Sequence, residues 1–299
     1  MRYTLDKKNY ADFNTFEIGK LAPRTYFIPY PDRASADAVS LKEKRYRSPK
    51  VVCLNGEWDF KFYQNPNDVP SVLDTDTVTF GKLDVPSCWQ FRGYLKPFYV
   101  NSRYQFPYDP PVIPTTEPAG KVFCWHGADK GPRPRYHTPE NEYNSVGVYR
   151  TFFEVEDPTK GYVVSFLGVA NCLDLYVNGS FVGYSEGTHN TAEFDLAPFV
   201  KEGQNELVAV VHRWCNGTYL ECQDMFRNNG IFRDVLLRVS EPVDLWDIDF
   251  QTKKTKAGYT ATVKVELRGE TDVTISLEGN GLSEKKTVKS EGYIAKAVF

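Results

Sequence analysis

Residues 213–235, RWCNGTYLECQDMFRNNGIFRDV, combine three carboxylates, three arginines, two cysteines and four aromatic rings. Neighbouring carboxyl groups can act as general acid and base, and the planar fork of an arginine can bind a carboxylate in a bidentate manner. A loop with so many charges also needs internal pairing. We therefore predict a structural network from the charged residues of this stretch: Glu221, Asp224, Arg227, Arg233 and Asp234.

The other polar and aromatic residues of the stretch have plain structural interpretations. Asn216-Gly217 is a turn-forming pair, although turns at a domain edge are also where binding groups lie. Trp214 and Phe226 are predicted to pack in the core or between domains in preference to forming a flat sugar-binding surface. The stretch is therefore interpreted as a rim loop with its supporting strand.

Metal and nucleophilic chemistry have little support in the sequence. Cys124, His126 and His137 lack a fourth ligand at the spacing of a zinc site. His189 and His212 belong to no motif with a serine, cysteine or carboxylate, so both are predicted to be structural. The six cysteines include no C-x-x-C pair, which favours reduced thiols.

Composition excludes several classes of protein. The 299 residues carry a formal net charge of −3, so nucleic acid is not an expected partner. The basic run 41–50 is predicted to be a solvated segment. No stretch approaches 18 apolar residues, which argues against a membrane protein, and the N-terminus lacks the apolar region of a signal peptide. We expect a cytoplasmic protein.

The elements that must position the loop are short strands. Residues 58–63, WDFKFY, alternate with period two, and 162–169, YVVSFLGV, are typical of a strand buried on both faces. Residues 173–187 alternate on both sides of Asn178-Gly179, which is a strong hairpin signal. Strands at this spacing without a helical period predict an all-β chain, a jelly-roll β-sandwich followed by a second β-sandwich.

The predicted organisation has three parts. Residues 1–50 form an extended N-terminal arm, 51–240 a jelly-roll domain with an inserted surface loop at 118–145, and 241–299 a partial, truncated second β-sandwich. About 100 residues are needed for a complete sandwich of that type, which is why the second one is predicted to be truncated. The loop is rich in Gly, Pro and charge and lacks a period, and such long stretches are unusual inside a compact domain.

Several long motifs, in order, resemble the N-terminal region of glycoside hydrolase family 2, and most closely its large bacterial β-galactosidases. They are LNGEWDFKFYQNPNDVP, VPSCWQFRGYLKPFYVNSRYQFPYDPPVIPT, GVYRTFFEV, YVNGSFVGYSEG, AEFDLAPFVKEGQNELVAVVHRW and GTYLECQDMFRNNGIFRDV. The resemblance covers roughly residues 20–240. It implies that 51–240 is a jelly-roll sugar-binding domain and that 241–299 is a truncated immunoglobulin-like β-sandwich. It implies a galactosidase whose two catalytic glutamates lie on a (β/α)8 barrel, which takes about 250 residues. Retaining hydrolysis needs two carboxyl groups about 5–5.5 Å apart, so no catalytic residue is assigned to this chain.

The resemblance also implies two substrate-binding residues. One is Asn101 in PFYVN, and the other is Asn216 in RWCNGTYLE, where the family has an Asp that also binds sodium. An amide oxygen lacks the charge that holds a cation in competition with water, which puts sodium binding at Asn216 in doubt. Cys222 likewise stands where an Asp is usual.

For the full-length enzyme the resemblance implies Na⁺ and Mg²⁺, a β-galactoside substrate, contacts with the remaining domains of the parent chain, and a homo-oligomer. Two alternatives stay open. One is another family 2 glycosidase, such as a β-glucuronidase or β-mannosidase. The other is a free-standing carbohydrate-binding module, which the fold permits.

Overall fold

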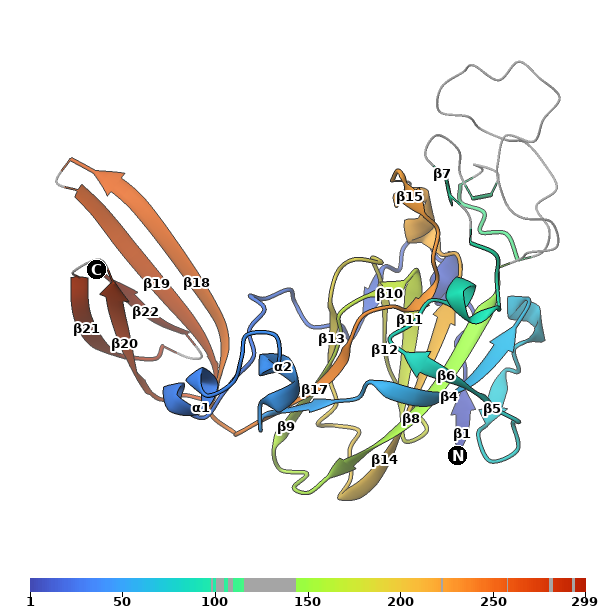
Figure 1. Ribbon diagram of the computed structural model, residues 1–299, viewed down its shortest axis with the longest axis horizontal. Helices are drawn as coiled ribbons and strands as arrows, with labels where there is room; N and C mark the ends of the chain where they lie inside the picture. Colours follow the sequence, from blue (N-terminus) through green and yellow to red (C-terminus); the bar gives the residue numbers. More distant parts are fainter. Residues whose placement is uncertain are drawn as a thin grey trace, which may run out of the picture. The chain divides into compact units, whose positions relative to one another are not determined.

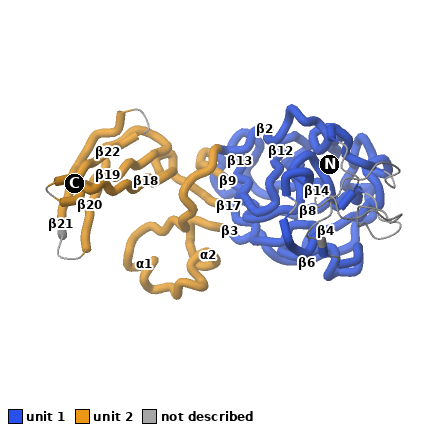
Figure 2. The backbone as a smooth tube through the Cα atoms, turned by 90° about the horizontal axis from the view of Figure 1, so that it is seen from above, with its two compact units in different colours: residues 1–21, 52–158, 163–237 blue, residues 22–51, 159–162, 238–299 orange. Residues whose placement is uncertain are grey.

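The computed structural model describes residues 1–97, 99–100, 105–106, 110–115, 144–221, 223–256, 258–279, 282–291 and 294–299. The chain divides into two units, coloured separately in Figure 2. Unit 1 contains Met1–Leu21, Val52–Pro158 and Val163–Leu237, and unit 2 contains Ala22–Val51, Thr159–Tyr162 and Arg238–Phe299.

The larger sheet of unit 1 has seven antiparallel strands, several of which lie side by side in Figure 1. Across the sheet their order is β2 (Glu17–Ile18), β12 (Ser180–Glu186), β11 (Cys172–Val177), β14 (Gly203–His212), β8 (Val146–Val155), β4 (Gly56–Tyr63) and β6 (Gly81–Val85).

A four-stranded sheet has the order β13 (Ala192–Asp195), β9 (Gly161–Phe166), β17 (Val235–Ser240) and β3 (Val51–Cys53). Three strand pairs are separate from these sheets: β1 (Arg2–Thr4) with β5 (Val72–Asp74), β10 (Val169–Ala170) with β16 (Gly230–Ile231), and β15 (Met225–Phe226) with β7 (Tyr99–Val100). The described helices are short: η1 (Asn9–Ala11), α1 (Arg33–Asp37), α2 (Lys44–Arg47), η2 (Pro66–Asp68), η3 (Trp89–Arg92) and η4 (Asn216–Tyr219).

The hairpin between β11 and β12 forms where the sequence predicts it. Asn178 and Gly179 adopt φ angles of 50° and 88°, the left-handed values that a tight two-residue turn requires. The side chain of Asn178 holds the turn, because its Nδ2 donates to Asn205 Oδ1 at 2.7 Å and its Oδ1 accepts from the amide of Glu206 at 3.0 Å. The turn thus places the strand that ends at Glu186 beside β11.

The predicted alternation of residues 58–63 is also present in the structure. Trp58 and Phe60 are 1% and 2% exposed in β4, and Trp58 Nε1 donates to the carbonyl of Leu54 at 2.7 Å. Burying a large aromatic side chain stabilises a fold by several kcal/mol, about 3–5 by truncation to alanine. Together with the sheets described above, this alternation confirms the prediction of an all-β chain built from sandwiches. The jelly-roll connectivity remains a prediction.

The first 50 residues, predicted as one extended arm, contribute to both units. Arg2–Thr4 pair with β5, and Tyr3 is fully buried with its hydroxyl donating to Glu206 Oε1 at 2.7 Å. Glu17–Ile18 add an edge strand beside β12. The segment 22–51 belongs to unit 2.

Unit 2 contains a sheet of β18 (Asp244–Thr255), β19 (Gly258–Arg268) and β22 (Ile294–Val298), and a pair formed by β20 (Asp272–Gly279) and β21 (Leu282–Lys289). Trp246 is surrounded by three guanidinium groups, from Arg24 at 4.7 Å, Arg238 at 5.7 Å and Arg268 at 4.3 Å from its ring. These cation–π contacts join the segment 22–51 to the strands of its own unit.

Among the described residues, no helix combines the length and apolar character that crossing a membrane requires. Of the predicted loop 118–145, residues 118–143 lie outside the described residues, and so do Asn101, Cys124, His126, His137 and Cys222.

Candidate functional site

The loop that residues 213–235 contain begins where β14 ends, at His212. Trp214 is fully buried, and Asn144 holds its backbone on both sides, accepting from the amide at 2.8 Å and donating to the carbonyl at 3.2 Å. Its ring packs 5.0 Å from that of Phe106. The interpretation of Trp214 as a packing residue therefore agrees with its burial, whereas Phe226 is 61% exposed.

Asn216 is the first residue of η4 and is only 2% exposed. Its Nδ2 donates to three oxygens: the carbonyl of Asp12 at 2.9 Å, Oε1 of Glu186 at 3.0 Å and the carbonyl of Thr15 at 3.5 Å. Its Oδ1 is covered and has no hydrogen-bond partner among the described residues. The residue is thus fixed by its amide nitrogen, and its oxygen remains an unused acceptor.

Glu186, at the end of β12, is the centre of the polar contacts below η4. Its Oε1 accepts from Tyr184 Oη at 2.6 Å and from Asn216, and its Oε2 accepts from the amide of Gly217 at 2.7 Å. Burial raises the pKa of this carboxyl to about 7, against the opposing effect of the hydrogen bonds that it accepts. The motif YVNGSFVGYSEG contains Glu186 but did not single it out, since its partners Asn216 and Gly217 come from 30 and 31 residues further along the chain.

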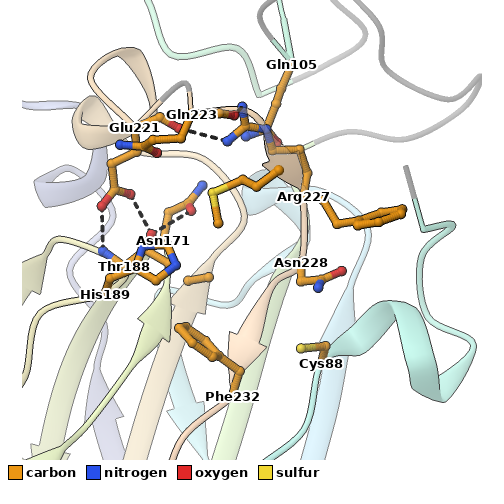
Figure 3. Close-up of a pocket in the computed structure, with 13 residues that line it drawn as sticks. Cys88, Gln105, Asn171, Thr188, His189, Glu221, Gln223, Arg227, Asn228 and Phe232 are labelled. Carbon is orange, nitrogen blue, oxygen red and sulfur yellow. Dashed lines mark hydrogen bonds between the residues drawn. The ribbon is translucent and has the colours of Figure 1, made fainter. Parts of the chain in front are cut away.

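A cavity of about 100 Å³, the rim pocket, lies beside this loop in unit 1. Figure 3 shows Glu221, Arg227 and Phe232 from the stretch 213–235, with Asn171 and Thr188 from neighbouring segments, lining it. The lining mixes apolar side chains with amides, a carboxylate and a guanidinium. Such a mixture is typical of sites for small polar ligands.

One wall of the rim pocket is a continuous chain of hydrogen bonds, called the network below. Glu221 Oε1 accepts from the amide of Thr188 at 2.7 Å and Oε2 accepts from its hydroxyl at 2.5 Å. That hydroxyl also lies 3.1 Å from Asn171 Oδ1, and Asn171 Nδ2 donates to Thr218 Oγ1 at 3.1 Å. The network therefore connects the pocket wall to η4, and Asn171 and Thr188 are two residues that no sequence signal indicated.

Among the described residues, the charged side chains of the loop make contacts with neutral groups. Arg227 Nη1 donates to the carbonyl of Glu221 at 2.9 Å, and Arg233 Nη1 to that of His189 at 3.1 Å. Asp234 Oδ1 accepts from Asn55 Nδ2 at 2.9 Å, and Asp224 accepts from the hydroxyl of Tyr99. A structural role was predicted for these charged residues. In the described part of the chain, their contacts are with backbone carbonyls, side-chain amides and hydroxyls.

The residues do not make a sodium site by themselves. Within the part of the chain that the structure describes, no three His, Cys, Asp or Glu side chains are grouped so that they could hold a metal ion. At the position where the resemblance implies sodium, Asn216 offers a single neutral oxygen. Hard cations prefer several oxygens, carboxylates among them, so the described donors do not fit the ion.

Comparison with known proteins identifies the family. Residues 51–126 and 134–242 match the family described as glycosyl hydrolases family 2, sugar binding domain. The chain belongs to this family. Its sequence is 35% identical over 257 residues to a β-galactosidase from Actinobacillus pleuropneumoniae and 31% identical over 265 residues to one from Staphylococcus xylosus. These alignments cover 86% and 88% of this chain but only 22% and 24% of the relatives, so the chain spans about a fifth to a quarter of their length.

Solved structures of family 2 enzymes share the fold. A β-D-mannosidase from Dictyoglomus thermophilum superposes with a TM-score of 0.52 at 14% identity, covering 83% of this chain and 30% of that one. A β-glucuronidase from Bifidobacterium dentium gives a TM-score of 0.50 at 14% identity, with 83% and 41% covered. At these identities the likeness shows the fold alone.

Proposed function

We propose that this chain acts as the N-terminal, non-catalytic region of a cytoplasmic β-galactosidase that hydrolyses terminal β-D-galactosides. The observation that carries the proposal is the 35% identity to a β-galactosidase across 86% of the chain. The described residues form antiparallel sheets, and the catalytic carboxyl pair of a retaining glycosidase is assigned to the rest of a longer parent protein.

Within that enzyme, we propose that the loop 213–221 and Asn101 contact the sugar. The feature of this chain that supports the role of Asn216 is its amide oxygen, which has no donor among the described residues. A sugar hydroxyl is a donor of the required kind. Reaching that oxygen requires movement of the atoms that cover it.

Substitutions in the full-length parent test the two contacts. Asn101→Ala and Asn216→Ala are each expected to raise KM for a chromogenic β-galactoside roughly tenfold, which corresponds to about 1.4 kcal/mol of lost binding. Asn67→Ala, at an exposed asparagine of η2, is the matched control and should leave KM unchanged. An unchanged KM in both site variants would refute the proposed contacts.

Substrate choice and binding by the chain itself separate the alternatives. The parent should prefer a β-galactoside to the corresponding β-glucuronide and β-mannoside, and the reverse preference would support another family 2 glycosidase. The 299-residue chain should show no hydrolysis of a chromogenic β-galactoside after removal of host enzyme. Tight sugar binding by the chain alone, with no longer parent protein, would favour a carbohydrate-binding module.

A further inference from the structure

The pair Asn216 and Glu186 contains one amide and one carboxyl group in direct contact, with Nδ2 and Oε1 separated by 3.0 Å. Among the described residues, Glu186 is the source of the carboxyl oxygen bonded to Asn216, since the other two acceptors are the backbone carbonyls of Asp12 and Thr15. The side chain of Asp12 instead accepts bonds from within its own loop, from Asn14 and Thr15. In the described part of the chain, the carboxyl group that contacts Asn216 is therefore that of Glu186 on β12.

A carboxyl group at position 216 would lie about 3 Å from that of Glu186, a distance at which two carboxylates cannot both ionise readily. It would also lose the donor that now serves both Glu186 and the carbonyl of Asp12. The geometry accommodates one acid and one amide, but not two acids.

We propose that Glu186 supplies the carboxyl group of this site and acts as the positioning residue that orients the side-chain amide of Asn216. The positioning role of Glu186 rests on the sugar contact proposed above for Asn216. The charge relationship, in which positions 186 and 216 accommodate one acid and one amide, does not depend on that contact.

The positioning follows from the direction of the hydrogen bonds. Three acceptors surround Nδ2 of Asn216, so Oδ1 must point away from Glu186. Glu186 is itself held on both oxygens, by the hydroxyl of Tyr184 and the amide of Gly217. A glutamine at 186 could present either an oxygen or an NH₂ group to Asn216, and the orientation would no longer be determined.

Of the groups that surround Glu186, Asn216 is the one whose replacement by an acid would change the charge of the site. Glu186 is faced by Tyr184 from its own strand, by the thiol of Cys215 before η4, and by Cys172 from β11. Burial raises the pKa of Cys172 and that of Tyr184 well above their ordinary values, so both remain neutral at physiological pH. Asn216 is thus the neighbour whose replacement by an acid would introduce a second charge.

A double-mutant cycle in the 299-residue chain tests the charge relationship. Asn216→Asp alone should lower the thermal midpoint by several degrees at pH 8. The loss should shrink at pH 5, where one of the two carboxyls can hold a proton. Adding Glu186→Gln to Asn216→Asp restores one acid and one amide with their places exchanged, and should recover at least half of the loss at pH 8.

The neutral control is Asn216→Ala, which removes the amide without adding charge. At pH 8 its loss should be smaller than that of Asn216→Asp, because it removes one hydrogen bond from the ionised Glu186 and adds no second charge. If Asn216→Asp does not fold while the double variant does, the relationship is supported. A double variant no more stable than Asn216→Asp, or an Asn216→Asp chain as stable as the unmodified one at pH 8, would overturn it.

The positioning role is tested in the full-length parent by comparing KM with kcat. Glu186→Gln should raise KM for a chromogenic β-galactoside several-fold and leave kcat within about twofold, because it disturbs the orientation of a binding group and touches no reacting atom. If the stability cycle holds but KM is unchanged in Glu186→Gln and in Asn216→Ala, the proposed sugar contact fails and the charge relationship stands. If Asn216→Ala raises KM and Glu186→Gln does not, the positioning role fails alone.

Discussion

The ring of Tyr10 lies nearly parallel to the imidazole of His212, with centroids 4.4 Å apart and an interplanar angle of 14°. Beneath this stack, His212 Nε2 is 3.8 Å from Asp174 Oδ2, and Asn9 Nδ2 donates to Asp174 Oδ1 at 3.0 Å. The short helix η1 therefore covers a buried imidazole and carboxyl, both of which burial drives toward their neutral forms.

His212 should contribute to loss of stability in acid. Burial lowers its pKa to about 3 from an ordinary value of 6.5. Below pH 6.5 the unfolded chain binds a proton at this histidine and the folded chain does not. The stability contributed by the neutral imidazole is therefore fully present above pH 6.5 and is lost as pH falls toward 3. His212→Phe keeps an aromatic ring under Tyr10 and should flatten the pH dependence of the urea midpoint between pH 6.5 and 4.5. The exposed His189, changed to Phe, should leave that slope as it is.

Asp174 should show the opposite dependence. Burial raises its pKa to about 8 from 3.8, so its contribution is fully present below pH 3.8 and is lost as pH rises toward 8. Asp174→Asn should gain stability relative to the unmodified chain as pH rises from 5 to 8, measured by urea unfolding. Two salt bridges, to Lys82 at 2.9 Å and to Arg150, lower the pKa of Asp59 despite its burial. Asp59→Asn should accordingly lose stability at pH 8, and a shared direction for the two variants would contradict this account.

The wall of the rim pocket depends on Glu221. Glu221→Gln replaces one of the two acceptors that hold Thr188 with a donor, which should cost about 1–3 kcal/mol in the unfolding free energy. Hydrogen exchange at the amides of Thr188 and η4 should accelerate. Thr188→Ser keeps both donors and is the matched control, expected to remain within about 0.5 kcal/mol. Unchanged exchange in Glu221→Gln would show that the network does not support η4.

Trp246 should hold the segment 22–51 in unit 2. Trp246→Ala removes the ring that three arginines contact, and tryptic cleavage at the basic residues of α1 and α2 should become several-fold faster. Trp246→Phe retains an aromatic face and should give an intermediate rate. Tyr259→Ala, at a ring that is 76% exposed in the same unit, should cleave like the unmodified chain.

The sequence predicted features that depend on local order. The hairpin at Asn178-Gly179 follows from two adjacent residues, and the burial of Trp58 and Phe60 follows from period-two alternation. The family motifs likewise predicted the fold class of unit 1. These signals are read within a few residues, so no three-dimensional information is needed.

The contacts of the candidate site could not be predicted in the same way, because they join distant segments. Asn216 bonds to Asp12, 204 residues earlier in the chain, and to Glu186, 30 residues earlier. The sequence shows that residue 216 is an asparagine, but it does not show that the carboxyl group of Glu186 lies against it. The division of residues 1–50 between the two units is likewise set by long-range pairing, as between Tyr184 and Ile18.

The positions of β2 and β3 in their sheets also determine when unit 1 can be completed. Glu17–Ile18 pair with β12, and Val51–Cys53 lie beside β17, which ends at Ser240. At about 5–20 residues per second, a ribosome needs roughly 8–34 s to go from Ile18 to the end of β12 at Glu186, and roughly 9–37 s to go from Cys53 to Ser240. During these intervals β2 and β3 lack the strands that they lie beside, so both are made early and can be ordered only late. Early exposure of strand edges of this kind is where a nascent β-protein depends most on chaperones.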